Sequence, residues 1–368
     1  MKKLFFGLIL AMVSCVSAHA VVIAQDPLFI SAQADPRVML VASRDHQLFI
    51  KAYTDYSDLD GDGFLDTAFT PYIEYDGYFN PRKCYTYQNN RFEATAAATT
   101  ETVTVTFPNG STASKSRYVC ASQWSGNLLN WASMTRADIV RKVFYGGYRS
   151  KDDESETVLE RAHLPRDVHA FAKVFDAGTT GNMNKFTPYN DQTSISFCNL
   201  TNDGATASKS STNPPVIQVA NGAFRLWAAN EHPQCGTSNT VITKPTSLRA
   251  TLNARVKVCD DGGGVDTISG PGPKCKTYLK TGTAKKPIGV LQQYGDADVS
   301  LSLKFGLMTG SWAHGKSGGV LRKNIGSLSN SGGKYPNNYN CATSGEGFVS
   351  GSSDEIDFCT GVLVNNQG

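Results

Sequence analysis

Apolar positions along the chain recur in patterns that distinguish strands from helices. A short apolar run at residues 38–41 predicts a fully buried strand of a parallel sheet. Residues 102–107 alternate between apolar and polar side chains and lead into Pro-Asn-Gly at 108–110, which predicts a hairpin. Residues 299–305 alternate again and predict a strand with one buried face.

Two stretches have helical spacing. Apolar residues from Asn127 onward recur at three- or four-residue steps until Gly146-Gly147, which predicts one amphipathic helix with a glycine stop. A second helical pattern covers residues 158–174 and is interrupted by Pro165. The tyrosine-rich residues 72–79 predict a β segment before Cys84.

The composition divides the chain into regions. Residues 21–175 carry the predicted sheet and helices, whereas residues 176–283 are rich in Ser, Thr, Asn and Gly and hold four cysteines. We interpret this second region as a disulfide-stapled, loop-rich insertion. Residues 284–368 return to an ordered α/β pattern.

Residues 1–20 have the features of a secretory signal peptide. Lys2 and Lys3 precede a mainly apolar run over residues 4–16, and Ala18-His19-Ala20 follows as a small-residue cleavage site. No later stretch approaches the 18 apolar residues of a membrane span. We therefore expect an exported chain without a transmembrane segment.

Export changes the number of cysteines and the net charge of the mature chain. Loss of residues 1–20 removes Cys15 and leaves eight cysteines, an even number that suggests disulfides and permits 105 pairings. Cys259 with Cys275, and Cys341 with Cys359, would close short loops. The remaining 33 basic and 32 acidic residues give a net charge of +1, so the charge balance indicates no nucleic acid partner.

The sequence DLDGDGFLD at residues 58–66 is the strongest chemical signal. Calcium takes six to eight oxygen ligands, and EF-hand-like loops supply them at alternating positions around a glycine. Here Gly63 occupies the sharp turn. The spacing assigns the metal ligands to Asp58, Asp60, Asp62, the Phe64 carbonyl and Asp66.

The loop departs from a full EF-hand at position 12, where Phe69 replaces the bidentate glutamate. A shorter calcium loop completed by Glu74 or by water is the preferred interpretation. The alternative is a solvated acidic turn, because turns also favour Asp and Gly.

Enzymatic motifs find little support. Residues 310–317 satisfy the P-loop pattern, but Gly318-Gly319 follows where a helix should begin. The histidines are scattered, and neither GxSxG nor HExxH occurs. We predict no catalytic or organic-cofactor residues and no enzymatic activity.

Four groups of segments, in order, resemble the N-terminal region of the PilY-type family of exported type IV pilus biogenesis factors and tip adhesins. The resemblance covers about residues 36–175 and 284–330. Its motifs are PRVML with SRDHQLF, AYTDYSDLDGDGFLD with YIEYDGYFNPRKCYTY, SGNLLNWASMTRADIVRKVFYGG with VLERA, and KPIGVLQQYGD with FGLMTGSW and GGVLRKNIG.

The resemblance implies an α/β fold, with a von Willebrand A-like sheet flanked by helices and a disulfide-containing, loop-rich β insertion. Family members continue into a large β-propeller, for which this chain has no room, so we expect a truncated or split product. The DxSxS metal signature of von Willebrand A domains is absent, since residues 39–45 read MLVASRD. We therefore do not expect the metal site of von Willebrand A domains in this chain.

Together these observations predict an exported, non-enzymatic type IV pilus assembly factor or pilus-tip adhesin with a structural calcium loop. Its expected locations are the periplasm, the outer surface or the pilus tip. Its expected partners are minor pilins or pilus-tip proteins, and host or abiotic surfaces. The alternatives are a free-standing calcium-dependent surface or glycan binder, an exported hydrolase, and a nonfunctional fragment of a longer adhesin.

Overall fold

The computed structural model divides the chain into Met1–Pro36 and a second unit, Arg37–Gly368, and only the second is considered below. The described residues are 36–43, 45–164, 169–201, 213–229, 234–237, 243–264, 266, 270–278, 285–296, 303–310, 319–328, 356–357 and 359–363. The expected signal peptide and the P-loop-like residues 311–317 therefore lie outside the described residues. So does Cys341, the predicted disulfide partner of Cys359.

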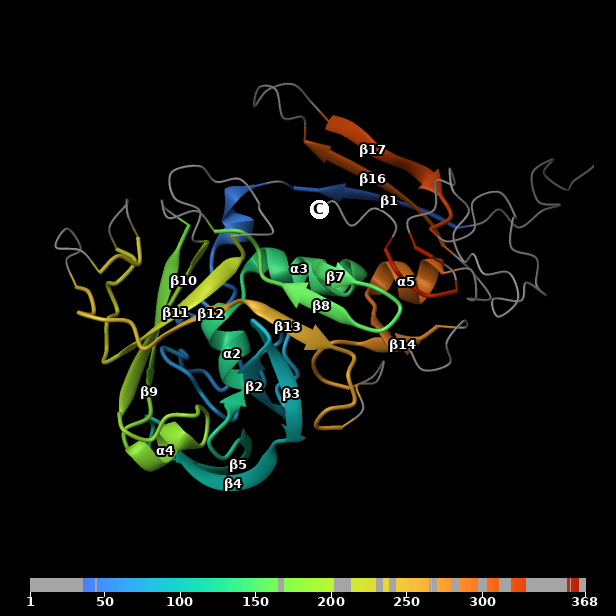
Figure 1. The fold of residues 1–368 in the computed structure, drawn as a ribbon. Helices are drawn as coiled ribbons and strands as arrows, with labels where there is room; N and C mark the ends of the chain where they lie inside the picture. The colour runs from blue at the N-terminus through green and yellow to red at the C-terminus, as the bar shows by residue number, and fades with distance from the viewer. Residues whose placement is uncertain are drawn as a thin grey trace, which may run out of the picture. The chain divides into compact units, whose positions relative to one another are not determined.

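Strands predominate over helices in the described part of the chain (Figure 1). The strands are β1 (Arg37–Ala42), β2 (Lys83–Gln88), β3 (Arg91–Ala97), β4 (Thr99–Thr106), β5 (Thr112–Val119), β6 (Trp124–Ser125), β7 (Arg149–Asp152), β8 (Thr157–Glu160), β9 (Phe171–Asp176), β10 (Ser194–Thr201), β11 (Pro215–Asn221), β12 (Ala250–Asn253), β13 (Arg255–Val258), β14 (Cys275–Thr277), β15 (Lys285–Pro287), β16 (Lys304–Gly310) and β17 (Gly319–Gly326). The helices are η1 (His46–Phe49), α2 (Gly126–Ser133), α3 (Arg136–Tyr145), α4 (Thr180–Asn184) and α5 (Val290–Gly295). None of these described helices is long and apolar enough to cross a membrane.

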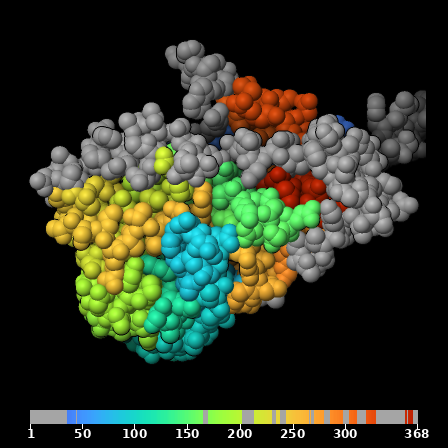
Figure 2. Space-filling view, viewed as in Figure 1, coloured from blue at the N-terminus to red at the C-terminus, as the bar shows by residue number. Residues whose placement is uncertain are grey.

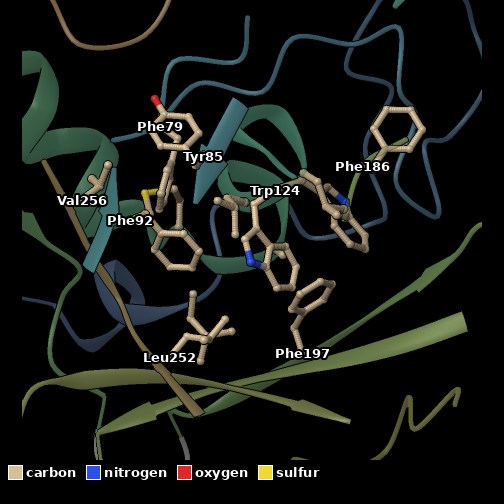
Figure 3. Packing of buried hydrophobic residues seen from close by; sticks show 14 of the residues in the cluster. Phe79, Tyr85, Phe92, Trp124, Phe186, Phe197, Leu252 and Val256 are labelled. Atoms are coloured by element: carbon tan, nitrogen blue, oxygen red, sulfur yellow. The ribbon is translucent and has the colours of Figure 1, made fainter. Parts of the chain in front are cut away.

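Two larger sheets enclose the main core. One has the strand order β6-β2-β3-β13-β8-β7, and the other has the order β12-β11-β10-β9. Helix α2 contacts both sheets and is buried on every side (Figure 1). Large aromatic side chains fill the space between these elements, including Phe92, Trp124 and Phe197, whose rings meet edge to face or tilted (Figure 3).

The stretch 176–283 contributes directly to this core. Ile195 and Val219 from this stretch lie in the same buried cluster as Leu128 of α2. Strand β13 also pairs with β3, through the buried residues Val256 and Phe92. Segments far apart in the sequence, coloured cyan and orange, also lie next to each other on the surface (Figure 2). The predicted domain boundaries stay predictions.

Three disulfides connect described residues. Cys84 pairs with Cys120 and Cys198 pairs with Cys235. Cys259 pairs with Cys275, which confirms the short loop expected from the sequence. Since disulfides persist in oxidising compartments, these bonds agree with an extracytoplasmic protein.

The β4–β5 hairpin is confirmed, but three other predicted elements are wrong. Residues 72–79 form turns and no strand, because their backbone groups bond to α2 instead. The predicted helix over residues 158–174 is replaced by two strands, because β8 pairs with the distant β13 and β9 pairs with β10, the next strand along the chain. The single helix from Asn127 is two helices, since Thr135 starts α3 with a capping box to Asp138.

Strand β1 pairs in parallel with β16, and β17 pairs antiparallel with β16. The parallel pairing of residues 38–41 is as expected, yet the strand is not fully buried. Its side chains alternate, and Val41 is 75% exposed. Strand β16 begins at Lys304, so only the end of the predicted strand 299–305 falls within described residues.

Two asparagines of α2 hold the irregular segment before β2. Asn127 accepts a hydrogen bond from Tyr75 N at 2.8 Å and donates one to Ile73 O at 2.7 Å. Asn130 accepts from Phe79 N at 3.0 Å and donates to the carbonyls of Tyr75 and Phe79, both at 2.8 Å. These bonds satisfy buried backbone groups that no strand or helix satisfies.

Replacing Asn130 with Ala should therefore lower the free energy of unfolding by about 3 kcal/mol, because three buried backbone groups lose their partner. Asn184→Ala is the matched control, since among the described residues that side-chain amide bonds only to the exposed Ser122 hydroxyl. Urea unfolding measures both. Equal losses in the two variants would contradict the anchoring role of Asn130.

Candidate metal centre

The acidic loop is closed at its base by backbone pairing. Asp66 N donates to Ser57 O at 2.9 Å, so the two ends of the loop form an isolated β-bridge. Within the loop, Gly61 and Gly63 have φ angles of 75° and 90°, which only glycine adopts at low cost. The sequence therefore folds locally into a tight turn with its carboxylates on short, constrained backbone.

Three of the four predicted carboxylates converge. Oxygen atoms of Asp58, Asp60 and Asp66 all lie within 4.8 Å of one another. Like charges at this separation repel, so the arrangement favours a bound cation or strong local hydrogen bonding. Hard oxygen donors in this arrangement match the preferences of calcium.

Backbone amides provide part of the compensation. Asp58 accepts bonds from the amides of Gly61, Asp62 and Gly63 at 2.7, 3.1 and 2.8 Å. Asp66 accepts from Leu59 N at 2.9 Å. Each carboxylate oxygen has two lone pairs, so these bonds orient the groups and leave acceptor capacity for an ion.

Asp62 does not join the cluster of three. Its Oδ1 accepts from Phe64 N at 2.8 Å, and the Phe64 ring stacks on Phe107 with ring centroids 6.4 Å apart. The roles of Asp62 and of the Phe64 carbonyl as ligands stay predictions.

The two residues beyond the loop are engaged elsewhere. Phe69 is buried and packs its ring against Trp131 and Phe175, with centroids 5.6 and 5.4 Å away. Position 12 therefore anchors the loop in the core instead of supplying a ligand. Glu74 forms a two-point ion pair with Arg82 at 2.9 and 2.7 Å, so its carboxylate is committed to that partner.

A basic side chain from another element faces the loop. Lys115 of β5 lies with its Nζ 3.4 Å from Asp60 Oδ2, and 5.5 Å from the centre of the Tyr72 ring. Burial, followed by the negative charges of Asp60, Asp62 and Asp66, raises the pKa of Tyr72. The loop therefore has a strong negative field. Among the described residues, Lys115 is the cation that forms an ion pair with a carboxylate of this loop.

Sequence reasoning found the converging aspartates but missed two contributors. Lys115 is 55 positions from Asp60 and no local pattern connects them. Thr70 donates from its hydroxyl to Asp66 Oδ1 at 3.1 Å, an i, i+4 contact that the loop motif does not include.

Comparison with known proteins identifies the family of the chain. The family model for the PilY1 homolog small alpha/beta domain matches residues 66–220, and that for the PilY1 homolog second domain matches residues 305–366. The chain belongs to the PilY1-type family. Most of the acidic loop precedes the first matched segment, which begins at Asp66.

Two curated relatives are similar. One Xylella fastidiosa protein, a type IV pilus biogenesis factor PilY1 homolog, is 31% identical over 326 residues, covering 84% of this chain and 20% of the relative. A second PilY1 homolog of that organism is 29% identical over 179 residues, covering 45% of this chain and 13% of the relative. The chain thus spans about a fifth or less of the length of these relatives. No solved structure matches.

Because Lys115 and a divalent cation would compete for Asp60, Lys115→Gln should raise calcium affinity about threefold, the size expected for a partly exposed ion pair. Calcium titration by calorimetry measures this change. Lys285→Gln is the control, since Lys285 pairs with the exposed Asp261 outside the loop. An unchanged or weaker affinity in Lys115→Gln would exclude competition at Asp60.

Proposed function

We propose that this chain acts in type IV pilus biogenesis as an exported, non-enzymatic component with a structural calcium loop. The observation that carries the proposal is the convergence of Asp58, Asp60 and Asp66 in a chain of the PilY1-type family. The printed names of both relatives describe type IV pilus biogenesis factors, and the three disulfides agree with export.

Calcium would act by holding the carboxylates together. Asp58, Asp60 and Asp66 would bind the ion, with Asp62 and the Phe64 carbonyl as the further ligands expected from the sequence. Bound calcium would offset the repulsion between the carboxylates and order the turn against the β4–β5 hairpin, which Phe64 contacts through Phe107.

A von Willebrand A-like arrangement is part of this proposal. The parallel pairing of β1 with β16, across more than 260 residues of intervening sequence, supports it. In such a sheet β1 and β16 would be neighbouring parallel strands, and residues 176–283 would form the insertion before the chain returns to the sheet.

The role at the pilus would be one of binding. Minor pilins or pilus-tip proteins are the proposed partners, with adhesion to host or abiotic surfaces as the proposed role of a displayed chain. The periplasm, the outer surface and the pilus tip are the corresponding locations.

The calcium part is tested by calorimetry and thermal unfolding of the purified exported chain. Calcium should bind and raise the melting temperature, by the equivalent of about 2.7 kcal/mol at one hundred times the dissociation constant. Asp60→Ala should abolish both effects. Asp176→Ala, which removes an exposed carboxylate outside the loop, should leave them intact. Absence of both effects in the unaltered chain would make the loop a solvated turn.

The pilus part is tested in cells that carry the full-length protein. Asp60→Ala should reduce the number of surface pili, and Asp176→Ala should not, with protein abundance measured in each strain. Pilus numbers that stay normal after deletion of the whole gene would exclude a role in pilus biogenesis, independently of calcium binding.

A further inference from the structure

A hollow of about 350 Å³ lies beside strand β9, lined by residues from five separate stretches of the chain. Lys173 of β9 and Trp131 of α2 line it from the core side. Lys51 and Asp55 come from the segment before the acidic loop, and Arg225 comes from the turn after β11. This volume suits a small ligand, because ligand pockets begin near 300 Å³.

The lining has an excess of positive charge. Among the described residues that line it, Asp55 is the single carboxylate, against the three cations Lys51, Lys173 and Arg225. Lys51 lies 3.5 Å from Asp55 Oδ2, while Lys173 bonds to Asp55 Oδ1, so two cations share one anion. Trp131 Nε1 also donates to Asp55 Oδ1 at 3.2 Å, which fixes the carboxylate in place.

Lys173 is a buried cation. Its side chain is 1% exposed, and its ammonium lies 4.4 Å from the centre of the Trp131 ring. Burial lowers the pKa of Lys173 to about 8, although Asp55 acts in the opposite direction, and the charge of Lys51 lowers it further. The ammonium also donates to Tyr53 O, so Lys173 is fixed by protein groups and adds its charge to the field of the hollow from behind its wall.

Arg225 completes the charge pattern from the other side. It is exposed and has no ion-pair partner among the residues that the structure describes. A guanidinium presents a planar fork of donors that matches a carboxylate or phosphate. Next to these cations, Tyr56 is 78% exposed and Leu226 is 53% exposed, so the rim offers apolar surface to the rest of a ligand.

We propose that this hollow binds an oxyanion-bearing ligand about the size of a monosaccharide. The carboxylate or phosphate of the ligand is held by Lys51 and Arg225, while the buried charge of Lys173 adds to the field that attracts it. The less polar face of the ligand rests on Tyr56 and Leu226. The acidic loop is not required for this binding, so the inference goes beyond the proposed function.

The test is calorimetric titration of the exported chain with glucuronate, glucose 6-phosphate, inorganic phosphate and neutral glucose. The two acidic sugars should bind and glucose should not. Stronger binding of glucuronate would identify a carboxylate ligand, and stronger binding of glucose 6-phosphate a phosphate ligand. Equal binding of inorganic phosphate and glucose 6-phosphate would show that the rim adds nothing and would overturn the sugar-sized part of the proposal.

Arg225→Ala is the variant of choice, because an exposed side chain without an ion-pair partner among the described residues can be removed without disturbing the core. It should weaken the binding of acidic sugars about tenfold, as expected for loss of a charge-assisted hydrogen bond. Arg37→Ala, on the exposed side of β1, is the matched control and should bind as the unaltered chain does. Equal binding by both variants, or no binding of acidic sugars by the unaltered chain, would overturn the proposal.

The pH profile separates this site from unspecific attraction. Asp55, Lys51 and Arg225 are the charged groups that face the hollow together with Lys173, and Tyr56 lies at its rim. Between about pH 7 and about pH 9, Lys173 loses its proton in the free chain, so the affinity for glucuronate should fall over this range. A flat profile would remove Lys173 from the binding site.

Discussion

The side-chain amides of α2 are the constraint on which the rest of this structure depends. Asn127 and Asn130 are buried and form hydrogen bonds with the backbone of residues 73–79. That segment belongs to no strand or helix and so lacks regular backbone hydrogen bonds. The contact is so close that a Cβ at Gly77 would lie 2.2 Å from Asn130 Oδ1. A long irregular segment can therefore lie inside a core of two sheets, because one fully buried helix supplies its missing hydrogen bonds.

That constraint explains why the acidic loop is not a full EF-hand. The segment that leaves the loop must turn at once into the core, where Phe69 meets the rings of Tyr75 and Trp131. A glutamate at this position would place an unpaired charge among aromatic rings, at a cost far above the gain from one more calcium ligand. The position that closes an EF-hand is used here to anchor the loop, and Thr70 bonds to Asp66 just beyond it.

Local signals predicted local structure well. The hairpin of β4 and β5 and the left-handed stop at Gly146 follow from turn residues and were predicted from them. Residues 158–174 were misinterpreted as helix because their apolar spacing fits either structure. Pairing of β8 with β13 and of β9 with β10 decides in favour of strands. The capping box at Thr135 was a readable signal for the break between α2 and α3, but continuous apolar spacing concealed it.

The distinction between local and long-range signals also applies to the two candidate sites. All the converging aspartates lie within nine positions, so the loop is visible in the sequence, whereas the cations of the hollow come from segments that only the fold brings together. Tyr56 lines the hollow and its neighbour Ser57 closes the acidic loop through Asp66. Two regions of opposite charge thus share adjacent residues, and a cation in the loop would strengthen the field that attracts an anion to the hollow. A cation that ordered Ser57 would also restrict Tyr56, so the two regions would then influence each other through charge and through the backbone.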